Sequence, residues 1–509
     1  MGMAARHRWE KEVPMLLHQL IAELDPQINL DDIVNVEIRG ICEDSRFVRR
    51  GDLFIARAGT KTEGVKFLGQ AVERGAAALV TEAQIADCAV PQVIVPDTAA
   101  AIGAIAQIFY NQPTRQMPVV GITGTNGKTT TAYLIRHILN KFNLRCGMIG
   151  TVETDDGKDR REAMMTTPGA IDVAKLLAAM RDNGCRGCAM EVSSHALHQG
   201  RVGSVRFAGA AFTNLTRDHL DYHGQMDQYA AAKSLLFQML DENAIAAVNA
   251  DDLWSDRMVA GCEARAVWFG FGPDADYRAT DSNTTSQGSR FILHTPDGSE
   301  EVAMGMIGRH NVANALAAAA LAGEVFRLSV HQIAGALRDA DGAPGRLQAV
   351  RAGQPFAVLV DYAHTDDALE KVLTALRPLT RGKLRVLFGC GGDRDRTKRP
   401  LMARAAECFA DVVYVTSDNP RTEDANEIIE QILAGFQDRR QKPPIVEPDR
   451  RAAIAKILED AEPGDVVLLA GKGHENYQIV GQTKRHFDDL EEAKMALQRT
   501  SVADRDSIT

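Results

Sequence analysis

The stretch Pro118-Val-Val-Gly-Ile-Thr-Gly124-Thr-Asn-Gly127-Lys128-Thr129-Thr130 carries the strongest structural signal in this chain. The apolar run 118–122 predicts a buried strand, and the apolar spacing of 129–142 predicts an amphipathic helix. The glycines between them allow backbone N–H groups to approach phosphate oxygens at a helix N-terminus, where Lys128 adds positive charge. A threonine hydroxyl directly after the lysine can ligate Mg²⁺. The strict pattern has a glycine where this chain has Ile122, so the match is to Gly-x-x-Gly-Lys-Thr-Thr.

The rest of the chain alternates strand-like and helix-like runs in three segments, 1–112, 113–342 and 343–509. The first segment ends in an alanine-rich helical run, after which 111–114 is expected to be a linker. Strands are expected at 52–56, 77–81, 92–95, 118–122, 189–192, 208–213, 356–360, 384–388, 412–416 and 466–469. We therefore predict an α/β fold of three domains, with a central P-loop-type, mostly parallel sheet and a Rossmann-like C-terminal domain. Ligands should bind beyond the carboxyl ends of the strands.

Composition excludes several classes of protein. The formal charge of the 509 residues is −10, so the chain is not suited to binding nucleic acid, and an anionic substrate would need local basic pockets. Among eight cysteines only Cys185 and Cys188 form a CxxC, which precedes a strand and predicts structural thiols rather than a zinc or redox site. No run of about 18 apolar residues exists, and the N-terminus lacks a signal peptide's apolar core. We expect a cytoplasmic protein without membrane insertion and infer no obligate protein partner.

Further motifs follow the glycine-rich turn in a fixed order. They are Glu191-Val-Ser-Ser-His195, Thr213-Asn-Leu-Thr-Arg-Asp-His219, Gly308-Arg-His-Asn311, Gly345-Arg346 and Asp361-Tyr-Ala-His364. Together with the turn, they make almost the whole chain resemble the Mur ligase and folylpolyglutamate synthetase superfamily. The resemblance implies an ATP-dependent ligase that phosphorylates a carboxylate and lets an amine displace the phosphate. In such chemistry the protein supplies positioning and charge neutralisation.

The resemblance also implies roles for residues around ATP and Mg²⁺. The nucleotide-binding set is Gly124, Thr125, Asn126, Gly127, Lys128, Thr129, Thr130, Asn311, Arg346 and Asp361. The metal-binding set is Thr129, Glu191, His219 and Lys233, the last as a carbamate, and the catalytic set is Lys128, Lys233, His219 and Arg346. Without the resemblance, His219 would be a structural histidine, Lys233 an exposed helix residue, and Arg346 equally well a surface arginine.

The N-terminal segment resembles the family's domain for a UDP-linked substrate, here UDP-N-acetylmuramoyl-L-alanyl-D-glutamate. The residues implied in binding it are Ser45, Thr60, Lys61, Thr62, Thr166, Thr167, Ser193, Gln199 and Arg201. Arg201 suits a diphosphate or a glutamate carboxylate. Met165 stands where the family has asparagine, so that asparagine's contact is not carried over to this chain.

The C-terminal segment has three loops that follow expected strands, at 392–395, 418–421 and 471–475, and we expect them to converge. The sequence Asp418-Asn419-Pro420-Arg421 resembles the family signature for meso-diaminopimelate, and lysine-adding relatives lack its arginine. Arg394 and Arg421 can bind the carboxylate that lysine does not have, while Glu475 can accept from the ammonium. The implied diaminopimelate site is Arg394, Asp418, Asn419, Pro420, Arg421, Gly471 and Glu475.

Three other interpretations remain open at this point. One is a neighbouring ligase of the same superfamily, which the 418–421 signature argues against. Another is a dinucleotide-binding oxidoreductase that uses 388–392, although this loop lacks the GxGxxG spacing. The third is a nucleotide switch or scaffold without catalysis.

Overall fold

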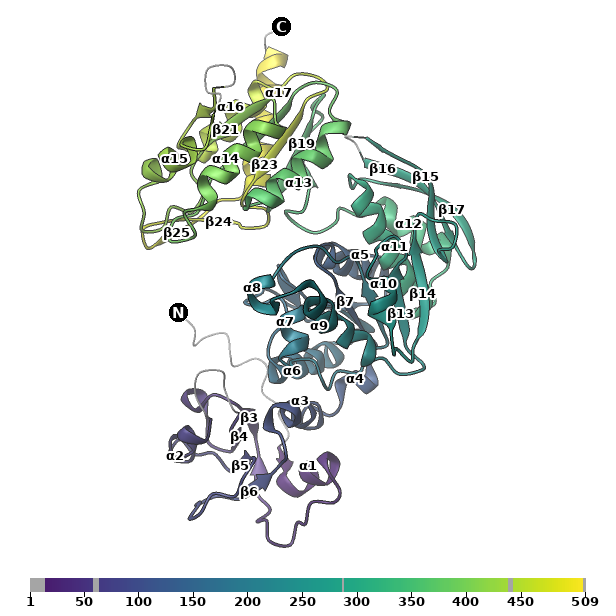
Figure 1. The fold of residues 1–509 in the computed structure, drawn as a ribbon, viewed down its shortest axis with the longest axis vertical. Coiled ribbons are helices and arrows are strands. Elements are labelled where there is room, and N and C mark those ends of the chain that lie inside the picture. Colours follow the sequence, from purple (N-terminus) through teal and green to yellow (C-terminus); the bar gives the residue numbers. More distant parts are fainter. Residues whose placement is uncertain (1–13, 58–63, 286–287, 438–442, 507–509) are drawn as a thin grey trace. The chain divides into compact units, whose positions relative to one another are not determined.

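The computed structural model describes residues 14–57, 64–285, 288–437 and 443–506. Successive parts of the chain form separate sheets with helices packed on them (Figure 1), which confirms the α/β class predicted from the sequence. The chain divides into two compact units, Met1–Tyr277 with Ala317–Ser329, and Arg278–Leu316 with Val330–Thr509. Domain boundaries at 112 and 342 stay a prediction.

The N-terminal part is a small parallel sheet in the order β3-β4-β5-β6. Its elements are β1 (Met15–Leu16), α1 (Leu17–Leu24), β2 (Glu37–Ile38), β3 (Gly40–Cys42), β4 (Asp52–Ile55), α2 (Leu68–Glu73), β5 (Ala78–Thr81), β6 (Gln92–Ile94) and α3 (Thr98–Phe109). Asp97 caps α3, because its carboxylate accepts hydrogen bonds from the first free N–H groups of that helix. The expected linker at 111–114 is only partly correct, since a short helix, α4 (Pro113–Gln116), begins within it.

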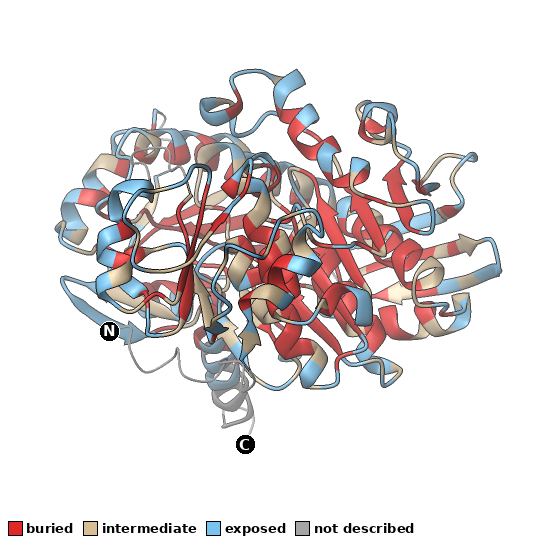
Figure 2. Cartoon of the chain, turned by 90° about the horizontal axis from the view of Figure 1, so that it is seen from below, coloured by how far each residue is buried: buried red, intermediate tan, exposed pale blue. Residues whose placement is uncertain are grey.

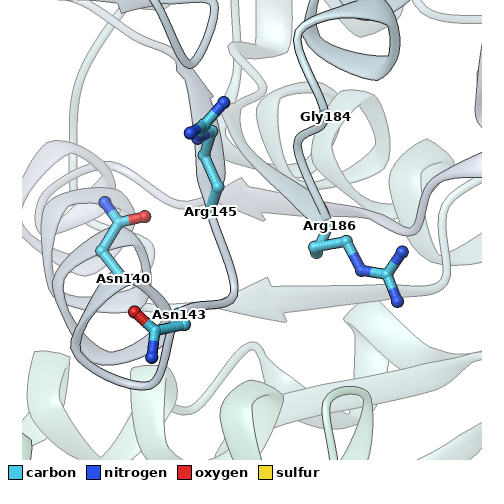
Figure 3. Close-up of a pocket in the computed structure, with 5 residues that line it drawn as sticks. All are labelled: Asn140, Asn143, Arg145, Gly184 and Arg186. Atoms are coloured by element: carbon cyan, nitrogen blue, oxygen red, sulfur yellow. The ribbon is translucent and has the colours of Figure 1, made fainter.

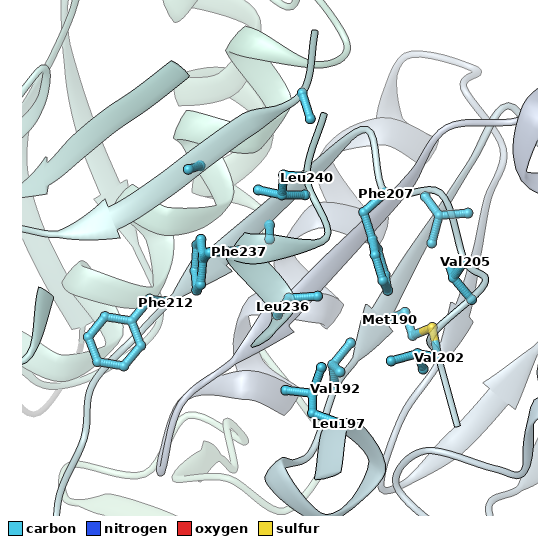
Figure 4. Close-up of a cluster of buried hydrophobic side chains, with 14 of the residues drawn as sticks. Met190, Val192, Leu197, Val202, Val205, Phe207, Phe212, Leu236, Phe237 and Leu240 are labelled. Carbon is cyan, nitrogen blue, oxygen red and sulfur yellow. The ribbon is translucent and has the colours of Figure 1, made fainter. Parts of the chain in front are cut away.

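Within the first unit, the strands of the central sheet run in the order β10-β9-β8-β11-β7-β12-β13-β14, and those from β8 to β14 are parallel. Its elements are β7 (Val119–Thr123), α5 (Lys128–Lys141), β8 (Cys146–Ile149), β9 (Glu153–Asp155), β10 (Arg160–Glu162), α6 (Ala170–Asp182), β11 (Gly187–Glu191), α7 (Ser194–His198), β12 (Gly209–Phe212), α8 (Leu220–His223), α9 (Met226–Gln238), β13 (Ile245–Asn249), α10 (Ser255–Val259) and β14 (Arg265–Gly270). Buried side chains form its core, among them Phe207 and, from α9, Leu236 and Phe237 (Figure 4). Because β11 and β12 flank β7, the loops after these three strands meet at one edge.

The second unit begins with an antiparallel arrangement that the sequence did not predict. Strands β15 (Tyr277–Thr285), β16 (Gly288–Thr295) and β17 (Gly298–Met304) pair in sequence order, and α12 (Val330–Arg338) packs on β17. Helix α11 (Arg309–Glu324) is shared by both units. These strands are rich in polar residues, so they lack the continuous apolar run that marked the parallel strands.

The C-terminal sheet has the order β18-β19-β23-β20-β21-β22 and is parallel except for β18. The sheet and its helices are β18 (Gln348–Ala349), β19 (Ala357–Asp361), α13 (Asp366–Leu376), β20 (Leu384–Phe388), α14 (Lys398–Phe409), β21 (Val412–Val415), α15 (Ala425–Leu433), β22 (Ile445–Val446), α16 (Arg450–Glu459), β23 (Val466–Ala470) and α17 (Asp489–Asp506). Strands β24 (Tyr477–Val480) and β25 (Thr483–His486) form a separate antiparallel pair. Strands β19, β20 and β23 are buried along their whole length, while the helices keep exposed faces (Figure 2). The loops after β19, β20, β21 and β23 leave the sheet at its carboxyl edge.

Candidate active site

The glycine-rich turn between β7 and α5 has the backbone that phosphate binding requires. Gly127 precedes the helix with φ 88°, and Gly124 has φ 146°. A Cβ at Gly124 would lie 1.9 Å from the Thr213 hydroxyl, so only glycine fits between this turn and the loop after β12. The Thr213 hydroxyl donates to the Asn126 carbonyl at 2.6 Å, which fastens the turn to that loop. The free N–H groups at the start of α5 therefore face a defined space.

Lys128 folds back over the same turn. Its ammonium donates to the carbonyl oxygens of Gly124 and Thr125, each at 2.9 Å. Thr125 in turn lies against the loop after β12, where its hydroxyl donates to the Thr216 carbonyl at 3.2 Å. The charge of Lys128 is thereby held against the turn, and its role toward phosphate stays a prediction.

Glu191, at the end of β11, is a buried carboxylate surrounded by hydroxyl and amide donors. Thr129 Oγ1 donates to Glu191 Oε2 at 2.9 Å, Thr151 Oγ1 to the same oxygen at 3.0 Å, and the Thr151 N–H to Oε1 at 2.8 Å. The side chain is fully buried. A carboxylate and a threonine hydroxyl in contact beside a phosphate-binding turn are the oxygen ligands that Mg²⁺ prefers, so Glu191 and Thr129 fit the predicted metal role.

Lys233 is buried, which corrects the exposed position that residue pattern alone indicated. It is 1% exposed, its Nζ donates to the Gly124 carbonyl at 2.8 Å, and it lies 4.5 Å from the centroid of the Tyr229 ring. Burial, together with the nearby charge of Lys128, holds the pKa of Lys233 well below its usual value. Lys233, on α9, therefore reaches the phosphate-binding turn, and its surroundings favour the neutral amine.

His219 lies at the rim of this site, in a cluster of aromatic rings. Its side chain is 47% exposed and its ring centroid lies 4.9 Å from that of His195. The more deeply placed His223 shares a hydrogen bond of 3.0 Å with the Ser194 hydroxyl, and burial lowers the pKa of His223 to about 4. His219 is therefore better placed than His223 to reach a bound ion.

Part of the set expected to hold the UDP-linked substrate is joined to Glu191 by hydrogen bonds. The Thr167 hydroxyl donates to the Glu191 carbonyl at 2.8 Å and accepts from the Ser193 N–H at 3.1 Å. Arg201 donates to the Thr167 carbonyl at 2.9 Å and to Gln199 Oε1 at 2.6 Å. Thr166 joins through a hydroxyl contact of 3.1 Å with Thr151, which also binds Glu191.

The N-terminal part contributes to the same region. Arg57 donates to the Gln199 carbonyl at 3.2 Å and lies 3.7 Å from Glu43. Ser45 is buried and donates to Gln70 Oε1 at 2.6 Å. Thr60, Lys61 and Thr62 lie outside the described residues. Met165, in place of the family asparagine, is 45% exposed.

In the second unit, Asp361 ends β19 and Arg346 precedes β18. Asp361 accepts from the N–H groups of Leu347 at 2.7 Å and Ala363 at 2.9 Å. Burial raises the pKa of Asp361, and Arg346 counteracts that rise. In the described part of the chain, Arg346 Nε is buried without a hydrogen-bond partner, and its guanidinium lies 5.2 Å from the Tyr362 ring. Such an unsatisfied donor suits an anionic ligand.

Asn311, near the start of α11, is also buried. Its Nδ2 donates to the Ile307 carbonyl at 2.8 Å, and its Oδ1 accepts from Asn314 at 3.2 Å. These two bonds fix which way the amide faces.

The three loops of the C-terminal sheet converge as predicted. Asn419 Nδ2, in the loop after β21, donates to Glu475 Oε2 at 2.8 Å in the loop after β23. Arg421 Nη1 donates to the Gly392 carbonyl at 2.7 Å in the loop after β20. Arg421 is half-buried, whereas Arg394 is exposed. The cluster therefore offers a cationic side at Arg421 and an anionic side at Glu475.

Three family models match the chain in sequence order. The Mur ligase family, catalytic domain, matches residues 37–110, the Mur ligase middle domain matches 122–322, and the Mur ligase, glutamate ligase domain, matches 345–473. The chain belongs to the Mur ligase family. It is accordingly an ATP-dependent ligase that forms amide bonds, with the three-domain architecture of that family. This membership removes the oxidoreductase and the non-catalytic switch from the alternatives.

The Mur ligase has close relatives over nearly its full length. A UDP-N-acetylmuramoyl-L-alanyl-D-glutamate–2,6-diaminopimelate ligase from Gloeobacter violaceus is 45% identical over 491 residues, 95% of this chain and 98% of the relative. The enzyme of the same name from Bacillus cereus is 41% identical over 91% of this chain and 94% of the relative. A solved structure of a ligase of that name has 33% identity and a TM-score of 0.73, and covers 94% of this chain and 99% of that one.

Some residues of the Mur ligase site were not predicted from the sequence. Lys472 is fully buried among the loops after β20, β21 and β23, and its place between two glycines after a strand could have indicated it. Arg399 is also fully buried and donates to Glu423 and Gln431, which joins α14 to the loop after β21. Local sequence did not indicate that Arg399 is buried, because its side-chain partners Glu423 and Gln431 are 24 and 32 residues away.

A hollow of about 520 Å³ lies at the opposite edge of the central sheet, where β8 and β11 begin (Figure 3). It is lined by Asn140, Asn143, Arg145, Gly184 and Arg186. None of these residues belongs to the predicted site, which lies at the carboxyl ends of the same strands. The hollow is therefore separate from the phosphate-binding turn. Within the described ranges, every helix is too short or too polar to span a lipid bilayer.

Proposed function

We propose that this ligase adds meso-diaminopimelate to the D-glutamate of UDP-N-acetylmuramoyl-L-alanyl-D-glutamate, forming ADP and phosphate, in cytoplasmic synthesis of peptidoglycan precursors. The observation that carries the proposal is the pairing of Arg421 with the loop after β20 and of Asn419 with Glu475. This pairing brings a cationic and an anionic side chain to the same group of loops, which matches an amino acid whose far end has both a carboxylate and an ammonium. The names of the relatives at 45% and 41% identity agree with it.

The phosphate and metal roles fall on residues of the first unit. The turn 124–130 would receive the ATP phosphates, and Asn311, Arg346 and Asp361 keep the nucleotide roles that the family resemblance implies. Thr129 and Glu191 would hold Mg²⁺, joined by His219 and by Lys233 as a carbamate. The ion would neutralise charge on the transferred phosphoryl group. Glu191 would contribute its negative charge to binding the ion. The hydroxyl and amide groups that donate to it are neutral, so they do not cancel that charge.

The reaction requires two bond exchanges. A glutamate carboxylate oxygen attacks the γ-phosphorus of ATP and releases ADP. The amine of the incoming amino acid then attacks the acyl carbon, phosphate leaves and the amine loses a proton. The protein's part is to align these groups and offset their charge, for which Lys128 and the N-terminus of α5 are placed beside the turn.

Lys233 is suited to the proposed modification. A neutral amine adds to CO₂, giving a carbamate anion and a proton, whereas an ammonium does not react. Burial and the charge of Lys128 favour the neutral form. The product would carry negative charge beside the turn, where an ammonium would repel a metal ion.

The test of the proposed function is an amino-acid panel assayed with ATP and the UDP-dipeptide. We expect phosphate release with meso-diaminopimelate, weak release with L-lysine, and none when the UDP-dipeptide is omitted. Efficient use of lysine would contradict the diaminopimelate assignment, and phosphate release without any amino acid would contradict the ligase reaction.

Lys233→Ala tests the carbamate separately. We expect loss of nearly all activity and partial recovery with small carboxylates such as formate, because an anion is required at this position. Lys141, an exposed lysine at the end of α5, provides the matched control as Lys141→Ala. Full activity of the Lys233 variant would contradict the role.

A further inference from the structure

Lys472 is a buried cation at the centre of the diaminopimelate loops. Its side chain is fully buried, in the loop after β23. Its Nζ donates to the Tyr477 carbonyl at 2.6 Å, to Asp418 Oδ1 at 3.2 Å and to Asn419 Oδ1 at 3.3 Å, and it lies 3.8 Å from Glu475 Oε2. Three acceptors satisfy the three hydrogens of an ammonium. Lys472 therefore has no hydrogen left for a substrate.

The hydrogen bonds of Lys472 determine the orientation of the Asn419 amide and the Asp418 carboxylate. Asn419 Oδ1 accepts from Lys472 and from the Ile479 N–H at 2.9 Å, so the amide must direct its Nδ2 toward Glu475. Asp418 gives Oδ1 to Lys472, while its Oδ2 faces Gly471, where an added Cβ would lie 3.6 Å away. Oδ1 of Asp418 is thus hydrogen-bonded within the protein, and Oδ2 faces Gly471, a predicted binding residue.

We propose that Lys472 is a positioning residue for amino-acid selection, which balances the charges of Asp418 and Glu475 so that together they bind the ammonium of the incoming amino acid. The two carboxylates and Lys472 sum to one negative charge, and a substrate ammonium brings the group to neutrality. Without Lys472 the two carboxylates would lose the ammonium that lies 3.2 Å from Asp418 Oδ1 and 3.8 Å from Glu475 Oε2. One of them would then take up a proton and stop accepting from the ammonium. The proposal rests on the proposed function and deepens it.

The surroundings of Glu475 support this argument. Burial and Asp418 raise the pKa of Glu475, and Lys472, the hydrogen bond from Asn419 and the charge of Arg421 oppose the rise. Tyr362, after β19, and Arg450, on α16, are other titratable or charged groups that interact with it. Lys472 is the cation that also binds Asp418 directly. Removing it should therefore raise the pKa of Glu475 further.

The decisive experiment compares Lys472→Met with the unmodified protein. We expect KM for meso-diaminopimelate to rise roughly tenfold or more, since a buried charge group would lose one partner. KM for ATP should stay unchanged, and the acidic limb of kcat/KM for diaminopimelate should move to higher pH. A merely structural role would not move that limb. Unchanged KM and pH profile would overturn the proposal.

The matched control is Arg385→Met. Arg385 Nε donates to Asp465 Oδ2 at 2.6 Å, and both side chains are buried at the amino-terminal edge of the same sheet. This variant loses a buried ion pair but should keep the diaminopimelate KM and the pH profile. An equal shift in the control would overturn the proposal, because it would show a general loss of stability.

A charge-preserving variant covers the case in which Lys472→Met does not fold. Lys472→Arg keeps the charge but cannot place three hydrogens on the same three acceptors. We expect a raised KM for diaminopimelate with the acidic limb unmoved, and an unchanged KM would overturn the positioning role. If the unmodified enzyme itself fails to use diaminopimelate, the proposed function fails first, which separates the two results.

Discussion

Arg421→Ala should reduce the use of meso-diaminopimelate by about 10- to 150-fold in kcat/KM. The guanidinium is oriented by its bond to the Gly392 carbonyl, at 2.7 Å, and the other donors of its planar fork can meet a carboxylate. A hydrogen bond to a charged group contributes about 1.5–3 kcal/mol, and each 1.4 kcal/mol is about tenfold. The loss should fall on diaminopimelate, because L-lysine has no carboxylate at that end.

The exposure of the two arginines sets the size of the effect. Arg421 is half-buried and Arg394 is exposed, so an ion pair with Arg394 should add no more than about 1 kcal/mol. Water can also solvate Arg421 when lysine is bound. We therefore expect kcat/KM for diaminopimelate to exceed that for lysine by roughly a hundredfold, the contribution of one arginine. A site with fully buried groups would discriminate by about 10⁴–10⁵-fold.

The assay measures kcat/KM for both amino acids with unmodified enzyme, Arg421→Ala, Arg421→Lys and the control Arg404→Ala. Arg404 pairs with Glu407 on α14 and has a half-exposed side chain. Arg421→Lys should recover only part of the activity, since it loses the planar fork. Equal use of the two amino acids by the unmodified enzyme, or an undiminished Arg421→Ala variant, would refute this reasoning.

Three further outcomes are expected. Gly124→Ala should abolish nucleotide binding and lower the thermal midpoint, because its Cβ would overlap the Thr213 hydroxyl; a nucleotide titration with normal affinity would contradict the turn geometry. Glu191→Gln should keep the fold, since the amide retains an acceptor, but lose Mg²⁺-dependent turnover, which a metal titration of the rate will show or refute. Arg450→Met should destabilise the C-terminal domain by about 3–5 kcal/mol in chemical denaturation, because it leaves the fully buried Asp489 unpaired; the double variant with Asp489→Leu should recover most of that loss.

Strand positions could be predicted because parallel strands buried on both faces leave continuous apolar runs in the sequence. The expected strand at 384–388 agrees with β20 at Leu384–Phe388, and that at 412–416 with β21 at Val412–Val415. The antiparallel strands from β15 to β17 could not be found in this way. Their burial alternates along the strand, and polar residues occupy many of the exposed positions.

In the candidate site, too, some residues could be predicted from local motifs and others could not. Glu191, Thr129 and Lys128 were predictable, since each stands at the end of a strand or the start of a helix in a recognisable motif. The partners of Lys472 were not predictable, because Asp418 and Asn419 are 54 and 53 residues away in sequence. Burial of Lys233 against the Gly124 carbonyl, 109 residues away, gave no local signal either.

Family, motif order and the chemistry of the phosphate-binding turn could all be read from the chain, because these depend on residues that are neighbours in sequence. Only the folded structure shows which residues far apart in sequence lie in contact. The sheet order β11-β7-β12 brings Glu191 and Thr213 to the turn after β7, and the order β19-β23-β20-β21 lets Lys472 reach Asp418. Charge balance and pKa depend on distances through space and on exclusion of water, and neither property is written in the local pattern of residues.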